Sequence, residues 1–424
     1  MIHLTAMQIS FHFLALAALP SVAGCVPEEL PPGTVAVTDV HVIAMDGSDP
    51  RPGATVLVRD GRIEAVVDDE VPLGEGAEVV DGGGGYLLPG LTDMHVHVRQ
   101  VEEFGLYLAA GVTTVRNMNG RFGDALEWKA LIARGELRAP RFVTASPTLF
   151  DELPDYPWHV EGPERARGLV RRFEADGYDM IKVYRLREPT VRALVDEAAA
   201  RGIPVVGHIP VPSLDLPAVL ELGFASLEHL DEFVGPGFGG ESDYERIGEV
   251  GGRIRASGVT VGTILSQWEA VNRALDDPAF LESDSLLAVA TRYFGEEGLE
   301  RARAMAEEFR ARSEAERERD RSDFDFLFAL LRELHRAGVN VVASTDAHQI
   351  LAPAGESLHN EMELFVRAGL SPTAALETAT TNAARALGNE DVAGTIAPGK
   401  NADLVLVEGN PLEDLSTLRR PLGV

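Results

Sequence analysis

Two histidines separated by one residue, His95 and His97, end an apolar run that begins at Leu91. Alternate residues of a strand point to the same face, so both imidazoles face one side and could share a metal ion. Alone, a His-x-His pair is a weak signal, because an ordinary strand presents such a pair by chance. Four of the 11 histidines of the chain, however, fall at the ends of apolar runs. The further residues with metal-binding or proton-transfer chemistry at such ends are Lys182, Tyr184, His208, His229 and Asp346.

A lysine beside imidazoles is unexpected in a metal site, because an ammonium group repels cations. A lysine whose pKa falls on burial can nevertheless react with carbon dioxide to give a carbamate. The carbamate is an anion with two oxygens that could bridge two metal ions. Imidazole and carboxylate ligands suit Zn²⁺, with Mn²⁺, Fe²⁺ and Co²⁺ as competitors. The alternative for Lys182 is a salt bridge to a nearby acidic residue.

The elements that must position these residues alternate between strands and helices. Amphipathic segments such as Val191–Arg201 and Leu327–Ala337 separate the apolar runs. Eight such units over one domain predict an α/β fold, a (β/α)₈ TIM barrel, whose site is built at the carboxyl ends of the strands. The eight predicted strands are Leu91–Val98, Val112–Asn117, Arg141–Ala145, Met180–Tyr184, Pro204–Ile209, Ser226–Leu230, Val259–Leu265 and Asn340–Asp346.

The barrel is predicted to occupy residues 89–390, between the two parts of a small β-sandwich. Residues 34–88 alternate between apolar and polar positions, and Asp60-Gly61 predicts a hairpin turn. Residues 391–424 return to β character and complete this second unit. A helical insertion of about 266–325 interrupts the barrel, and its part 296–325 holds 11 acidic residues and seven arginines. This charge pattern is typical of an exposed helix, and a role as a lid stays open.

The amino-terminal segment resembles a bacterial lipoprotein signal peptide. Residues 1–24 contain no charged side chain, and a short apolar run precedes Val22-Ala-Gly-Cys25. This resemblance implies cleavage before Cys25, which would carry the lipid, and residues 25–33 would form a tether. The apolar run is shorter than the roughly 20 residues that span a bilayer. We therefore expect an extracytoplasmic protein held at a bacterial membrane by a lipid anchor only.

Charge and cysteine content exclude other classes of site and partner. With 38 basic against 67 acidic residues, the formal net charge is −29. Nucleic-acid binding requires a net basic face, and electrostatic adhesion to anionic membranes also needs cations. Cys25 is the single cysteine, which excludes an internal disulfide and a multi-cysteine metal site. The expected partner is a small-molecule substrate, and the sequence leaves open whether the chain forms a homo-oligomer.

Three motifs resemble the amidohydrolase superfamily: Leu88-Pro-Gly-Leu-Thr-Asp-Met-His-Val-His97, Ile181-Lys-Val-Tyr184 and Ser344-Thr-Asp-Ala347. The last two are similar to the group of imidazolonepropionase-like amidohydrolases and metal-dependent Xaa-Pro dipeptidases. The resemblance implies a binuclear site with a hydroxide between the metals, and Asp346 as general acid and base. It implies that His95, His97 and Asp346 hold one metal, that His208 and His229 hold the other, and that carboxylated Lys182 bridges them.

Four residues are candidates for substrate contact. Tyr184 shares the face of Lys182 and could donate a hydrogen bond to the substrate carbonyl, or it could pack structurally. Arg116 could bind a substrate carboxylate or form an internal salt bridge. His159 follows the third strand, where substrate loops lie in this fold. His348 could contact substrate or support a metal ligand.

The leading interpretation is hydrolysis of a C–N bond in an amide, a peptide or a cyclic amide. Deamination of a heterocycle is an alternative, although the deaminases of this superfamily generally lack the bridging lysine. A lactone or ester hydrolase could use the same metal pair. A non-catalytic surface-tethered binding protein is the alternative of another class, and the complete set of six ligand-type residues argues against it.

Overall fold

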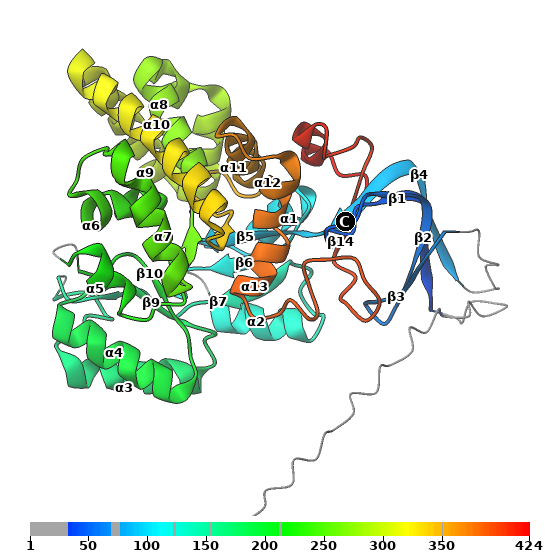
Figure 1. Ribbon diagram of the computed structural model, residues 1–424, viewed down its shortest axis with the longest axis horizontal. Helices are drawn as coiled ribbons and strands as arrows, with labels where there is room; N and C mark the ends of the chain where they lie inside the picture. Colours follow the sequence, from blue (N-terminus) through cyan, green and yellow to red (C-terminus); the bar gives the residue numbers. More distant parts are fainter. Residues whose placement is uncertain (1–32, 69–76, 122–123, 153, 212–213, 350) are drawn as a thin grey trace, which may run out of the picture.

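The computed structural model describes residues 33–424 except 69–76, 122–123, 153, 212–213 and 350. The predicted signal peptide, Cys25 and nearly all of the tether lie outside the described residues. A large α/β body and a small sheet lie side by side along the longest dimension of the molecule (Figure 1).

All eight predicted barrel strands are present. In chain order they are β5 (Leu91–Val96), β6 (Val112–Asn117), β7 (Arg141–Thr144), β9 (Ile181–Arg185), β10 (Val205–Gly207), β11 (Ser226–Leu227), β12 (Thr260–Gly262) and β13 (Val341–Val342). A short strand that the sequence did not reveal, β8 (Leu149–Phe150), pairs with β9. The strands hydrogen-bond as two parallel sheets, in the orders β5-β6-β7 and β13-β12-β11-β10-β9-β8.

Isolated parallel bridges link the two sheets at both edges. Ala145 after β7 pairs with Met180 before β9, and Val96 of β5 pairs with Ala347 after β13. The backbone N–H of Asp346 donates to the carbonyl of His95 over 2.8 Å. These pairings bring the carboxyl end of the first strand against the segment that follows the last. The predicted α/β fold class is confirmed.

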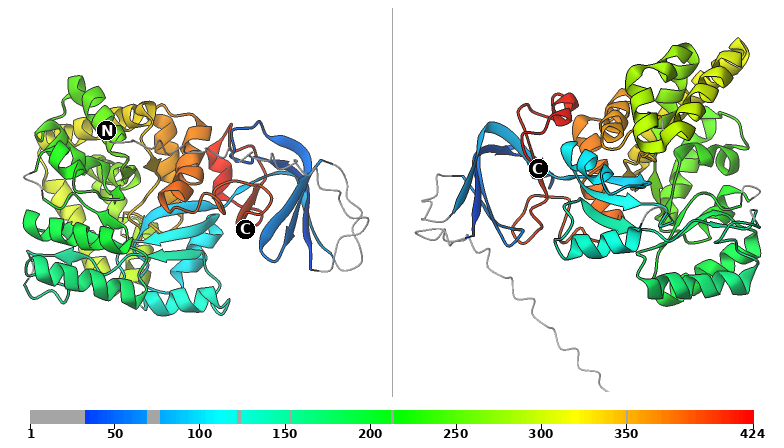
Figure 2. Two further views of the ribbon diagram at one scale, coloured as in Figure 1. Left: turned by 60° about the horizontal axis from the view of Figure 1, so that its bottom comes forward. Right: turned by 180° about the vertical axis from the view of Figure 1, so that it is seen from behind.

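Helices follow the strands and cover the parallel sheets (Figure 2). Pro163 begins α3 and Gly177 ends it in the left-handed conformation, the usual positions of these two residues. The helices of this part are α1 (Glu103–Ala109), α2 (Ala125–Ala133), α3 (Pro163–Asp176), α4 (Glu188–Arg201), α5 (Leu216–Leu220), α6 (Val234–Phe238), α7 (Ile247–Ser257), α11 (Glu356–Arg367), α12 (Pro372–Thr378) and α13 (Thr381–Ala386), with short 3₁₀ helices at Leu230–Phe233 and Tyr244–Arg246.

Between β12 and β13 the chain forms extra helices where the sequence predicts an insertion. They are α8 (Leu265–Asp276), a 3₁₀ helix (Pro278–Glu282), α9 (Asp284–Ala311) and the first half of α10 (Glu314–Ala337). These helices have a separate apolar core that includes Leu281, Ala290 and Ala306. They lie on the side of the molecule far from the small sheet (Figure 1).

The first turn of α8 is attached to the barrel by one buried carboxylate. Glu361 of α11 accepts hydrogen bonds from the backbone N–H groups of Leu265 at 2.9 Å and Ser266 at 2.6 Å. It also accepts a hydrogen bond from the Thr263 hydroxyl at 2.5 Å. Glu361 is fully buried, and such a group is costly to bury unless its lone pairs are used. This carboxylate therefore determines where α8 begins.

The small unit is built from both ends of the chain, as predicted, but its described residues form one five-stranded sheet and not a β-sandwich. Its five strands follow the order β14 (Leu404–Val407), β4 (Glu78–Pro89), β1 (Val35–Val42), β2 (Arg51–Arg59) and β3 (Arg62–Val67). They form one curved sheet, and Ile396 from the preceding loop packs in its core with Val56 and Leu87. A 3₁₀ helix (Leu415–Arg419) follows β14. Within the described residues, no helix combines the length and apolar character needed to cross a membrane.

Candidate metal centre

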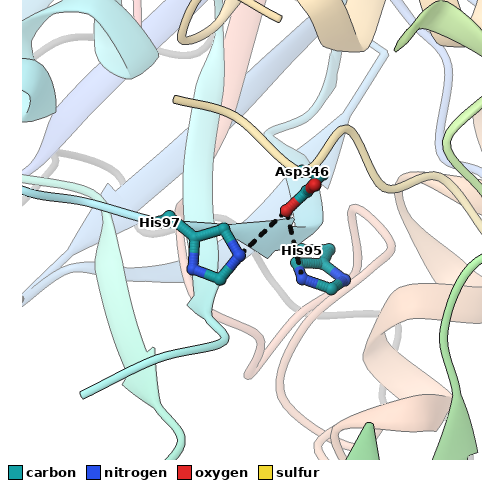
Figure 3. A group of neighbouring side chains, drawn as sticks. All are labelled: His95, His97 and Asp346. Carbon is teal, nitrogen blue, oxygen red and sulfur yellow. Dashed lines mark ion pairs between the residues drawn. The ribbon is translucent and has the colours of Figure 1, made fainter. Parts of the chain in front are cut away.

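His95 and His97 converge on Asp346 at the carboxyl end of the barrel strands (Figure 3). The Nε2 atom of His97 lies 2.8 Å from Asp346 Oδ1, and Nε2 of His95 lies 3.5 Å from the same oxygen. One ligand atom from each residue lies within 4.8 Å of the other two. Two imidazoles and a carboxylate at this spacing supply three of the four ligands of a tetrahedral shell, or half of an octahedral one.

The backbone at this end of the barrel is unusual at two of the predicted ligands. Asp346 has a φ of 57° and His229 a φ of 67°, in the left-handed region that side chains other than glycine rarely adopt. Gly207 precedes His208, and a Cβ atom there would lie 2.0 Å from the carbonyl oxygen of Val183. Such positions persist only where the surrounding structure enforces them, and here they direct side chains toward a common centre.

His208 and His229 lie next to the first group. Their ring centroids are 4.4 Å apart, and the His229 ring lies 5.1 Å from that of His95. The Nε2 atom of His229 is buried and has no hydrogen-bond partner among the described residues. The structure therefore brings all four predicted histidine ligands and Asp346 together in one cluster.

Lys182 is buried beneath this cluster, with 1% of its surface exposed. Its Nζ atom makes no hydrogen bond to any described residue. Burial lowers the pKa of Lys182 to about 8, although Glu228 and Asp346 act in the opposite direction. The uncharged amine, which is the form that reacts with carbon dioxide, is therefore accessible near neutral pH.

The electrostatics of the cluster favour metal ligation. Burial, together with the positive charges of Lys182 and the other histidines, holds the pKa values of His95 and His208 well below the usual range. Burial opposes ionisation of Asp346, but the hydrogen bond from His97 and the nearby positive charges lower its pKa. Neutral imidazoles and an ionised carboxylate are the forms that bind metals. This set of imidazoles and a carboxylate fits divalent metal ions, as do the buried nitrogens of Lys182 and His229.

Two glutamates that sequence reasoning missed support these histidines. Glu228 Oε2 lies 3.2 Å from His95 Nδ1, and Glu232 Oε1 lies 2.8 Å from His208 Nδ1. Such carboxylates orient a metal-binding imidazole and increase its basicity. Glu228 directly precedes His229 and Glu232 follows it by three residues, but this proximity in sequence does not reveal which rings the carboxylates face.

Arg116 forms the internal salt bridge that was one of its two predicted roles. Its Nη2 atom lies 2.7 Å from Glu228 Oε1, and it also donates to the carbonyl of Met94 and the hydroxyl of Ser226. Only 2% of Arg116 is exposed. Arg116 is not among the residues that line the neighbouring cavity, where a substrate would be contacted. Instead, it holds Glu228 against His95.

The other three residues predicted to contact substrate differ in whether they line the cavity. The Tyr184 ring packs edge-on against that of His208, with centroids 4.2 Å apart, and lines a cavity. His348 is buried with 1% exposed, and its Nδ1 lies 3.7 Å from Glu103 Oε2. His159 pairs through its backbone with Phe150 and is not among the residues that line this cavity. Of these three residues, only Tyr184 faces the cavity.

The cavity next to the cluster has a volume of about 460 Å³. Metal-ligand candidates form one wall, and α8, the end of α9 and α10 form the other. Its lining includes Tyr184, His208, His229, Asp231, Glu232, Ile264, Gln267, Trp268, Val271, Phe309, Arg312, Asp320 and Asp346. The predicted ligands thus open into a space large enough for a small-molecule substrate.

One family profile matches the carboxyl-terminal part of the chain. Residues 325–424, which include Asp346, match the profile of the amidohydrolase family. The resemblance to the amidohydrolase superfamily is confirmed.

The relatives of this chain include enzymes with different names. It is 27% identical to an imidazolonepropionase of Ralstonia nicotianae over 403 residues, covering 87% of this chain and 90% of that protein. It is 21% identical to an adenine deaminase of Moorella thermoacetica over 369 residues. That match covers 83% of this chain but only 51% of the deaminase.

Solved amidohydrolase structures share the fold. The bottromycin amidohydrolase has a TM-score of 0.72 and 26% identity, covering 92% of this chain and 85% of that one. A Xaa-Pro dipeptidase with bound methionine has a TM-score of 0.70 and 21% identity, covering 92% and 97%. Similarity over such a large part of both chains includes the barrel and the small sheet.

We expect Glu228→Gln to weaken metal binding by about 10–100-fold, because the amide cannot supply the charge that the carboxylate offers to His95. Competition with a chromogenic chelator on initially metal-free protein measures the affinity directly. Glu221→Gln, at an exposed position after α5, is the matched control and should bind metal normally. Equal affinities of the two variants would contradict a positioning role for Glu228.

Proposed function

We propose that this amidohydrolase hydrolyses a C–N bond in a small amide, peptide or cyclic amide, using two divalent metal ions, most simply Zn²⁺. The observation that carries the proposal is the cluster of four histidines, Asp346 and buried Lys182, of which His208, His229 and Asp346 line one cavity. Imidazolonepropionase, dipeptidase and amidohydrolase are the names of its relatives and structural neighbours, which supports the same class of bond.

In this proposal His95, His97 and Asp346 hold one metal ion, and His208 and His229 hold the other. Bound metal ions would lower the pKa of a water molecule and polarise the substrate carbonyl. Asp346 accepts a proton from the attacking water and delivers it to the nitrogen that leaves. Tyr184 lines the same cavity, from which its hydroxyl could donate a hydrogen bond to the carbonyl oxygen.

Lys182 contributes as a carbamate. Its neutral amine forms a bond to the carbon of carbon dioxide and loses a proton, which gives an anion with two oxygens. The buried, unpartnered Nζ atom and its lowered pKa support this reaction. The negative charge would offset part of the positive charge of two metal ions in a desolvated space.

Deamination of a heterocycle is the second candidate, and the similarity to an adenine deaminase favours it. Deaminases of this superfamily generally use one metal ion and no bridging lysine, so the buried position of Lys182 supports the binuclear hydrolase. Metal content separates the two: about two equivalents per chain are expected for the amide hydrolase and one for the deaminase.

Asp346→Asn should lower kcat by about 10²–10⁴-fold, the usual contribution of a general acid and base. The amide oxygen can still ligate a metal ion, so most of the metal should stay bound. Steady-state rates on a panel of dipeptides, N-acyl amino acids and cyclic amides, with metal analysis of the same samples, measure both effects. Normal turnover by the variant would exclude the proton-transfer role.

Lys182→Ala should lose both activity and part of its metal, because the bridging anion is gone. A short-chain carboxylic acid such as propionate can occupy the vacated space and should restore part of each. Rates and metal content are measured with and without the acid. Full activity and two metal equivalents in the unsupplemented variant would show that no carbamate bridge is needed.

We also propose that Cys25 carries a lipid that holds the enzyme on the extracytoplasmic side of a bacterial membrane. The uncharged segment 1–24 and Val22-Ala-Gly-Cys25 support this location. In a bacterial host the full chain should sediment with membranes, and Cys25→Ala should move it to the supernatant. Ser10→Ala is the control that should leave sedimentation unchanged. Sedimentation of the Cys25 variant with membranes would refute the anchor.

A further inference from the structure

The cavity beside the metal centre has two chemically different parts outside the proposed metal ligands. One part presents polar acceptors from the segment after β11 and from α8. The other is apolar and comes from α8 and α9 of the insertion. The inference drawn from this division rests on the proposed function, since it concerns which amide the enzyme takes.

Two buried acceptor atoms on the polar side have no hydrogen-bond partner within the described residues. They are Oδ1 of Asp231 and Oε1 of Gln267, and both residues line the cavity. Glu232, beside Asp231, is already occupied by His208 and by the backbone N–H of Ile209. A buried acceptor without a donor is costly. A ligand that brings N–H groups would remove this cost.

The charges around the cavity favour a cation over an anion. Among the lining residues that the structure describes, Arg312 is the only arginine, and no lysine is present. Its guanidinium is already paired, with Nη1 lying 2.5 Å from Asp320 and Nη2 lying 3.7 Å from Glu308. A substrate carboxylate would therefore meet no available guanidinium among these residues. An ammonium group would meet the carboxylate of Asp231.

The apolar side is large enough for an aromatic or branched side chain. Trp268 and Val271 lie one turn apart on α8, and Phe309 lies near the end of α9. All three line the cavity. Because Glu361 fixes the first turn of α8, Gln267 and Trp268 are presented together from one rigid helix. A ligand must therefore donate a hydrogen bond to Gln267 and pack against the indole ring of Trp268 at the same time.

We propose that the cavity selects amides of an apolar amino acid whose α-amino group is free. The ammonium group binds Asp231 and Gln267, and the side chain packs against Trp268, Val271 and Phe309. An arylalkylamine such as 2-phenylethylamine carries both the ammonium group and the apolar ring in one small molecule. A blocked amine or a carboxylate in the same place lacks the first.

Binding to metal-free protein tests this selection independently of catalysis. In calorimetry, 2-phenylethylamine should bind at least tenfold more tightly than N-acetyl-2-phenylethylamine or 3-phenylpropionate. Asp231→Asn, which keeps the shape of the side chain, should abolish this preference. Glu241→Gln, at an exposed position outside the cavity lining, should retain it. Equal binding of the three ligands to the unaltered protein, or tighter binding of the carboxylate, would overturn the proposal.

Kinetics on the metal-loaded enzyme give a second readout. Kcat/KM for a phenylalanyl amide should exceed that for its N-acetylated form by at least tenfold. Trp268→Ala should reduce the preference for phenylalanyl over alanyl amides by about 10–100-fold. Cleavage of the N-acetylated amide at an equal or higher rate would overturn this selection and leave amide hydrolysis standing. Cleavage of no amide at all would overturn the proposed function, while the calorimetry would still decide what the cavity binds.

Discussion

The structure depends on the electrostatic balance of one buried cluster. Four imidazoles, an amine and a guanidinium lie within a small desolvated volume, and each would be destabilising there as an isolated cation. Glu228, Glu232 and Asp346 offset this charge through direct contacts with His95, Arg116, His208 and His97. Burial lowers the pKa values of His95, His208 and Lys182, and the neighbouring positive charges lower those of the two histidines further. These low pKa values keep the imidazoles of His95 and His208 neutral and available as ligands.

The predicted metal ligands and the opposite wall of the cavity come from different parts of the chain. The predicted ligands lie at the carboxyl ends of barrel strands or directly after them. Parallel hydrogen bonding holds them there, together with backbone conformations that few other residues adopt. The wall opposite them comes from the helices between β12 and β13, which have a separate apolar core. Relatives with such different names as imidazolonepropionase and adenine deaminase are consistent with a barrel that keeps its reaction centre while the elements around it vary.

Much of the barrel and the ligand cluster could be predicted from the sequence. Apolar runs mark the strands because parallel strands are buried on both faces, and a polar residue that ends such a run lies at the edge where the site forms. For this reason His95, His97, Lys182, His208 and Asp346 could be found without a structure. That Arg116 pairs with Glu228 could not be predicted, because this ion pair joins residues 112 positions apart. Likewise, Trp268 and Phe309 look like ordinary helical core residues until the path of the insertion is known.

The contact between Glu361 and the start of α8 has a consequence for how this enzyme could diversify. A carboxylate in the barrel holds the two backbone groups that begin the insertion, so the barrel itself positions the first turn of α8. The sequences of α9 and the first half of α10 could then change, gain residues or be replaced without displacing the indole and amide groups that α8 presents. Evolution could change the far wall of the cavity while the predicted metal ligands and the first turns of α8 stay in place.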